Sequence, residues 1–233
     1  MTIIDLDDRR KTKLKEQRLW MERLWQWADR LDIEEYNVPR NEHELFNLTH
    51  LSFESYRYYG KDKFSELPPE IGNLSKLKFL ELGHVVNCEM QFLNNLTALP
   101  KEIGKLTELT HLYIQDNCLT ELPKEIGNLT RLKELKLGFN HLTTLPKEIG
   151  KLTRLEILTV WQNKLTKLPP EIGNLTQLKG LSVWGNPLVE LPPEIVNLTE
   201  LKELELGRNV RLSGSQKKWI NELKHNASNV HYM

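Results

Sequence analysis

The sequence predicts an α/β solenoid: a horseshoe with a concave parallel sheet of about seven strands and a helical cap at each end. Leu-Pro pairs recur at a fixed spacing, apolar residues alternate with a period of two ahead of each pair, and helical apolar patterns flank the repeats. Successive pairs are 23 residues apart, beginning at Leu99, Leu122, Leu145, Leu168 and Leu191. An earlier pair begins at Leu67. Units of this length bury little surface alone and form a continuous core only when stacked.

The unit at residues 132–145 illustrates one coil. Leu135 and Leu137 alternate with polar neighbours, which is the pattern of a strand with one buried face. Pro146 ends the strand because proline has no amide donor. The chain then turns on the convex side with Ile149 directed inward, and we expect a left-handed conformation at Gly150.

An asparagine recurs with the same spacing as the Leu-Pro pairs. It stands at Asn117, Asn140, Asn163, Asn186 and Asn209. A buried carboxamide destabilises a fold unless it bonds to neighbouring backbone groups, and stacked coils supply such groups. These asparagines are therefore predicted to form a structural ladder.

These features resemble the leucine-rich repeat family. The pattern L-x-x-L-x-L-x-x-N-x-L is present at residues 109–119 and 155–165, and the resemblance extends over residues 45–212. The L-P-x-E-I-G-x-L form is similar to that of bacterial and Ras-group leucine-rich repeat proteins. The resemblance implies a horseshoe used for protein–protein recognition, usually through the concave sheet, and no enzyme activity.

A helical cap is expected at residues 1–44, because an open solenoid end would expose core leucines. Residues 5–31 have the spacing of an amphipathic helix, with Leu14 and Met21 among the residues directed inward. We expect this helix to pack on the first repeat. A partner-binding or membrane-surface helix is the alternative.

A second cap is expected at residues 213–233. Ser215 is predicted to cap a helix that ends near His225. Val230 and Tyr232 follow with the spacing of a possible final strand.

The first two repeats are irregular because each has an insertion after its strand. The inserted residues lie near 54–62 and 83–94. Insertions on one side of a solenoid often belong to a binding surface, and both should lie on the same rim. Packing of the first coils against the cap is an equally weighted alternative.

Composition excludes several classes of function. Lys plus Arg equals Asp plus Glu at 32 each, which argues against a protein that binds duplex nucleic acid. Two cysteines, Cys88 and Cys118, suggest a reducing compartment. No signal peptide or membrane span is visible, so we expect a monomeric cytoplasmic protein or one exported without a cleaved signal.

The candidate binding site lies on the concave face, where side chains have no core to fill. Trp161 and Trp184 occupy equivalent positions on adjacent predicted strands, and exposed aromatic residues of this kind mark contact sites. The full set of predicted partner-binding residues is His111, Tyr113, Lys136, Phe139, Ile157, Trp161 and Trp184. The expected ligand is a protein of unknown identity.

Two alternatives to an internal protein-binding scaffold stay open. The two tryptophans form a platform on which a sugar ring could stack, which makes glycan binding the second class. A bacterial effector that targets a host protein is the other. No catalytic residues, cofactor or metal site are predicted, because His84, Cys88 and His111 lack a fourth ligand with recognisable spacing.

Overall fold

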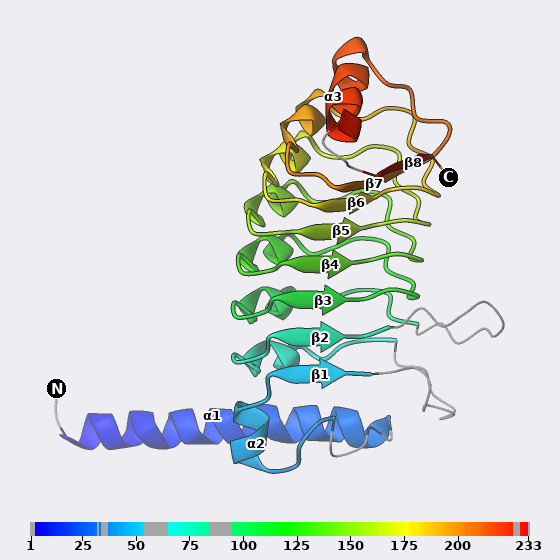
Figure 1. The fold of residues 1–233 in the computed structure, drawn as a ribbon. Helices are drawn as coiled ribbons and strands as arrows, with labels where there is room; N and C mark the ends of the chain where they lie inside the picture. The colour runs from blue at the N-terminus through cyan, green and yellow to red at the C-terminus, as the bar shows by residue number, and fades with distance from the viewer. Residues whose placement is uncertain are drawn as a thin grey trace.

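The computed structural model describes residues 3–31, 33, 37–53, 65–83, 95–225 and 229–232. The chain winds into a stack of similar coils, with a strand on one side and a short 3-10 helix on the other (Figure 1). Aliphatic side chains fill the space between these two layers and form one continuous core. The predicted solenoid fold is confirmed.

The sheet of the described chain has eight parallel strands in sequence order. They are β1 (His50–Ser52), β2 (Phe79–Glu81), β3 (His111–Tyr113), β4 (Glu134–Lys136), β5 (Ile157–Thr159), β6 (Gly180–Ser182), β7 (Glu203–Leu206) and β8 (Asn229–Tyr232). Each of the first seven strands has a buried leucine as its second residue. The possible final strand predicted at the carboxyl end is confirmed as β8, which pairs with β7.

The convex side consists of 3-10 helices that each begin directly after the proline of a Leu-Pro pair. They are η1 (Pro69–Asn73), η2 (Lys101–Lys105), η3 (Lys124–Asn128), η4 (Lys147–Lys151), η5 (Pro170–Asn174) and η6 (Pro193–Asn197). The prediction of a left-handed conformation at Gly150 is wrong, because its φ is not positive. Glycine is needed there for space: a Cβ would lie 2.7 Å from the carbonyl oxygen of Glu171 in the next coil.

The asparagine ladder lies between the ends of the strands and the convex side. Asn117, Asn140, Asn163 and Asn186 are buried, and their carboxamides bond to backbone groups of their own and adjacent coils. Asn209, at the end of the series, is exposed and donates to the carbonyl of Leu188. The ladder prediction therefore holds for the four buried members and is wrong about burial at the last.

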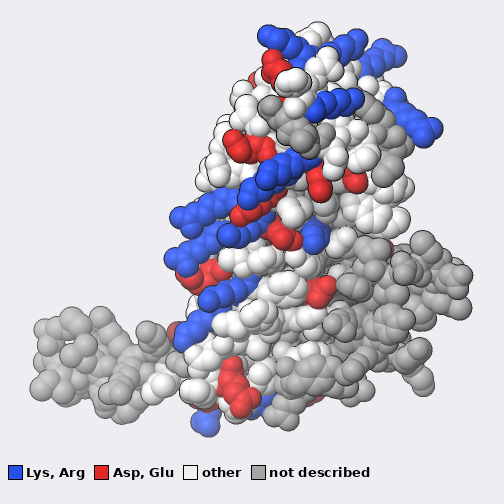
Figure 2. All heavy atoms as spheres, in the orientation of Figure 1, with Lys and Arg blue, Asp and Glu red and all other residues white. Residues whose placement is uncertain are grey.

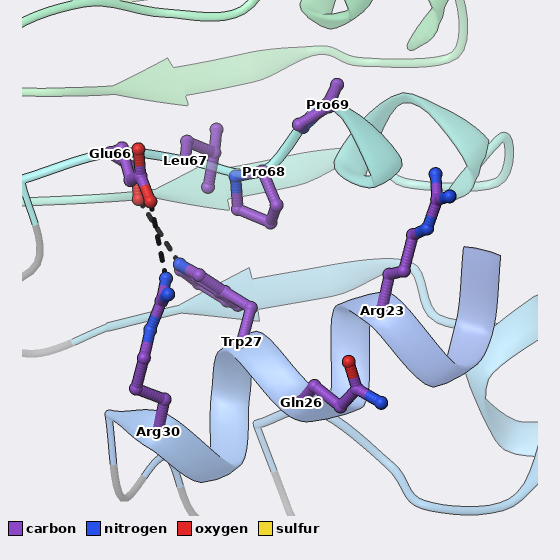
Figure 3. A pocket seen from close by; sticks show the side chains of 8 residues that line it. All are labelled: Arg23, Gln26, Trp27, Arg30, Glu66, Leu67, Pro68 and Pro69. Atoms are coloured by element: carbon purple, nitrogen blue, oxygen red, sulfur yellow. Dashed lines mark hydrogen bonds and ion pairs between the residues drawn. The ribbon is translucent and has the colours of Figure 1, made fainter. Parts of the chain in front are cut away.

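The amino-terminal helix α1 (Ile3–Arg30) packs against the first coil (Figure 3). The Trp27 indole, 4% exposed, donates to the backbone carbonyl of Glu66, while Arg30 contacts the Glu66 carboxylate. Met21 is buried as predicted, but the prediction that Leu14 is directed inward is wrong, since it is 57% exposed. The amino-terminal part of α1 extends past the repeats (Figure 1). A one-turn helix, α2 (Glu42–Phe46), then leads the chain into β1.

The carboxyl-terminal helix α3 (Gly214–His225) covers the last coil with Trp219, Ile220 and Leu223. The prediction that Ser215 caps this helix is wrong. Ser213 is the cap: its hydroxyl accepts from the Gln216 amide, and the Gln216 side chain accepts from the Ser213 amide. These reciprocal bonds form a capping box, which satisfies two amides at the start of a helix.

The two rim insertions predicted near residues 54–62 and 83–94 lie outside the described residues, except for Gly83. Their role stays a prediction.

Candidate functional site

The concave face of the sheet carries side chains that point away from the core. Equivalent residues of adjacent strands are paired in register, so that Ile157 of β5 faces Glu134 of β4 and Gly180 of β6. The same register continues past the strands and aligns positions 138, 161, 184 and 207 in one row. A row of this kind places side chains from neighbouring coils about 4.8 Å apart.

An aromatic cluster lies where β4, β5 and β6 end, and we name it the tryptophan stack: Phe139, Trp161 and Trp184. The two indole rings are 5.2 Å apart between centroids and 13° from parallel. The Phe139 ring meets Trp161 edge to face at 4.4 Å. Both tryptophans are half-buried, and Phe139 is 41% exposed. The predicted association of these three residues is present in the structure.

The backbone at Phe139 is in a left-handed conformation, with φ of 52°. The same position of neighbouring coils is also left-handed, in Asp116, Gln162 and Gly185. Glycine, aspartate and asparagine tolerate this region best, whereas a bulky residue is strained there. The exposed phenylalanine therefore adds strain at a place where the fold accepts glycine.

The ring of Trp161 occupies space provided by Gly138. A Cβ at position 138 would lie 2.6 Å from two atoms of the indole ring. Trp161 thus leans toward the preceding strand, and Trp184 stacks on its other side. Gly138, two residues after β4, therefore provides the space that the Trp161 ring occupies.

A second aromatic row crosses the first strands: His50, Phe79 and His111. Phe79 lies 5.9 Å from each histidine ring and 5.1 Å from the Tyr113 ring. His50 and Phe79 are not among the residues predicted from the sequence, although both are first residues of their strands, as His111 is. Tyr113, the last residue of β3, contacts this row, whereas the tryptophan stack begins with Phe139, which follows β4.

Tyr113 and Lys136 also meet at Glu134. The Tyr113 hydroxyl donates to Glu134 at 2.5 Å, and the Lys136 ammonium lies 3.2 Å from the same carboxylate oxygen and 4.2 Å from the centre of the tyrosine ring. Partial burial raises the pKa of Glu134, but the hydrogen bonds from Tyr113 and Lys136 outweigh it and hold the pKa below its ordinary value. Burial and the same carboxylate raise the pKa of Tyr113 well above its ordinary value. This network keeps the Glu134 carboxylate ionised and pairs its negative charge with the Lys136 ammonium.

A hollow of about 380 Å³ lies at the start of the strands, and Ile157 and Gly180 are part of its lining. Glu156, at its edge, lies between Lys133 at 3.4 Å and Lys179 at 2.6 Å, and the hydrogen bond from Lys179 helps to lower its pKa. Basic side chains gather along this flank of the solenoid with acidic ones between them (Figure 2). Ile157 thus lines a separate hollow with charged edges and is not part of the tryptophan stack.

The described residues contain no group of three His, Cys, Asp or Glu side chains able to hold a metal ion. His84 and Cys88 lie outside the described residues, so the prediction about them is not tested. Cys118 is a half-buried free thiol. Among the described helices, none combines the length and apolar character needed to cross a membrane.

Comparisons with known proteins agree on one family. A model described as "Leucine-rich repeat region" matches residues 30–140 and 135–226. A solved structure of a Leptospira interrogans LRR protein is 33% identical with a TM-score of 0.54, and the match covers 80% of this chain and 56% of that one. The LRR ectodomain of the plant membrane receptor kinase GASSHO1/SCHENGEN3 from Arabidopsis thaliana was solved in complex with CASPARIAN STRIP INTEGRITY FACTOR 2. It is 28% identical with a TM-score of 0.61, and the match covers 81% of this chain and 21% of that one.

The chain therefore spans about half the length of the Leptospira protein and about a fifth of the plant ectodomain. No curated protein matches it.

Proposed function

Because the chain belongs to the leucine-rich repeat family, a family of protein-binding repeats, we propose that it recognises a protein partner through the tryptophan stack on its concave face. The recognition is non-catalytic. The LRR ectodomain of the plant receptor kinase supports the proposal, since it was solved in complex with CASPARIAN STRIP INTEGRITY FACTOR 2.

The observation that carries the proposal is the placement of three large aromatic rings on a sheet face that covers no core. Trp161 and Trp184 stack at 5.2 Å and stay half-buried, while Phe139 keeps an exposed ring on a strained backbone. Strained residues and exposed apolar clusters both lower stability, and they are concentrated at functional sites. Tryptophan is also enriched among residues that dominate binding energy.

The test is affinity capture from a lysate of the source cells with three forms of the full chain. The first is the wild type, and the second carries Trp161→Ala with Trp184→Ala. The third carries His50→Ala with Phe79→Ala, which removes a matched pair of rings from the other end of the same face. Captured proteins are identified by mass spectrometry, and their dissociation constants are then measured with purified components.

We expect a protein that the wild type and the third form retain and the tryptophan variant loses. Each tryptophan should contribute about 2 kcal/mol or more to binding. Equal capture by all three forms would contradict the assignment of the site. If no protein is captured and a soluble saccharide quenches the tryptophan fluorescence, glycan binding replaces the proposal.

A further inference from the structure

The tryptophan stack has one open end. Its row contains Gly138, Trp161, Trp184 and Gly207, and Trp161 leans over the glycine that precedes it. A side chain at position 207 would be the next member of the row, but glycine supplies none. Among the described residues, Trp161 is the ring that contacts Trp184, and no cation lies over the Trp184 face. Within the described residues, the side of Trp184 turned away from Trp161 thus has no aromatic or cationic neighbour, and we name it the open end of the stack.

One carboxylate lies near this open end. Glu205 projects from the concave face of β7 two residues before Gly207, whereas Glu203, at the start of β7, lines the separate hollow. Glu205 is half-buried and accepts a hydrogen bond of 2.6 Å from the Ser182 hydroxyl. Within the described chain, neither carboxylate has a lysine or arginine within ion-pair distance.

Two other carboxylates on this side of the solenoid differ in this respect. Glu134 is compensated by Lys136, and Glu156 lies between two lysines. Glu205 differs from these two in having no lysine or arginine partner among the described residues, and its neighbour in register on β8 is His231. Lys202 and Arg208 flank β7 in sequence, yet neither forms an ion pair with Glu205 in the described residues.

We propose that the open end of the stack binds an arginine side chain of the protein partner, with its guanidinium against Trp184 and its charge paired with Glu205. This inference rests on the proposed function and names the chemistry that the partner must present. A guanidinium is planar, stacks on indole rings and bonds to a carboxylate through parallel N–H groups. A lysine ammonium lacks the planar shape, and a neutral aromatic ring would leave the carboxylate without a cationic partner.

The experiment uses a random dodecapeptide library displayed on phage, selected on the full chain and counter-selected on the Trp161→Ala/Trp184→Ala variant. A selected peptide is then synthesised with arginine and with citrulline, which keeps the planar shape and removes the charge. Binding of both peptides is measured by calorimetry to the wild type, Glu205→Gln and Glu81→Gln. Glu81 is the matched control, because it accepts a hydrogen bond of 2.6 Å from Ser52 at the other end of the sheet.

We expect selected peptides to be enriched in arginine, and citrulline to weaken binding about 10-fold. Glu205→Gln should weaken the arginine peptide by a similar factor, leave the citrulline peptide almost unchanged, and differ from Glu81→Gln, which should have little effect. Thermal melting of the variants checks that each remains folded.

Tryptophan-dependent peptides without arginine, or binding insensitive to Glu205→Gln, would overturn this inference and leave the proposed function standing. A library that yields no tryptophan-dependent peptide also overturns it. In that case the lysate comparison decides separately whether the stack binds a protein at all.

Discussion

Replacing Asn163 with leucine should destabilise the solenoid strongly, because one carboxamide joins two coils. Its oxygen accepts from the Leu142 amide at 2.9 Å. Its nitrogen donates to the carbonyls of Leu137, Val160 and Trp161 at 2.9, 3.0 and 3.2 Å. Leucine has the same number of side-chain heavy atoms in the same branched arrangement, so the substitution removes the hydrogen bonds, and its larger methyl groups add to the destabilisation.

The magnitude follows from which groups keep a partner. The Leu137 carbonyl still accepts from Asn140, and the Val160 carbonyl still accepts from Asn186. The Trp161 carbonyl keeps the Phe139 amide. The buried Leu142 amide loses its partner, which costs about 1 to 3 kcal/mol, and the three lost bonds add roughly 0.5 to 1.5 kcal/mol each. We therefore expect the free energy of unfolding to fall by about 3 to 7 kcal/mol.

The assay is urea denaturation followed by circular dichroism and tryptophan fluorescence. Asn209→Leu is the control, because this asparagine is exposed and its side chain makes one bond, to the Leu188 carbonyl. It should lower stability by about 1 kcal/mol at most, with an m-value equal to that of the wild type. Equal losses in the two variants would refute the reasoning, since the buried amide would then carry no special penalty.

Two further predictions concern coil packing and pH. Gly150→Ala should lower the melting temperature, because the added Cβ would lie 2.7 Å from the backbone carbonyl oxygen of Glu171. Gly214→Ala is the control: its Cβ would have no heavy atom within 4 Å, so the melting temperature should stay unchanged or rise. Equal effects of the two substitutions would contradict the packing argument. Glu134 has a folded pKa below its unfolded value, so its ionisation stabilises the fold above the ordinary glutamate pKa of about 4.3, and this contribution disappears as the pH falls through the folded pKa. Glu134→Gln should therefore show a shallower loss of stability between pH 5 and pH 3 in urea titrations, and an unchanged slope would argue against the network with Lys136.

The ladder also positions the candidate site. The side-chain amide of Asn163 donates a hydrogen bond to the Trp161 carbonyl oxygen, and the backbone amide of Phe139 donates to the same oxygen. The rings of the tryptophan stack therefore project from a backbone that is fixed from below by buried hydrogen bonds. Rigid support of this kind reduces the entropy that a binding surface loses when it engages a partner.

Some parts of the candidate site could be predicted and others could not. The adjacency of Trp161 and Trp184 follows from their 23-residue spacing, since the repeat period equals one step across the sheet. The grouping of Tyr113 with Phe79 could not be predicted, because it depends on which way two rings lean. The open end of the stack, and the absence of a lysine or arginine partner for Glu205 among the described residues, likewise depend on side-chain directions that spacing does not set.

Local errors in the sequence analysis have a common physical origin. Gly150 was expected to serve backbone conformation, but it serves the close approach of the next coil. Ser215 and Ser213 are both good capping residues, and the choice of Ser213 reflects the reciprocal bond with Gln216, whose side chain also reaches the Leu191 carbonyl. Leu14 matches the apolar spacing of the helix, but its side chain is exposed and does not pack against a coil of the solenoid.

The sequence by itself determined the solenoid, its strand order and its leucine core, because a fixed period forces every coil to repeat the conformation of the last and to bury the same positions. Only the tertiary structure decided which outward side chains meet. Rows on the concave face are set by register, but contacts across a row depend on ring direction, on space left by glycines such as Gly138, and on which carboxylates find a lysine. Those choices belong to side chains with no core to fill, and so the periodic pattern that specifies the fold leaves them open.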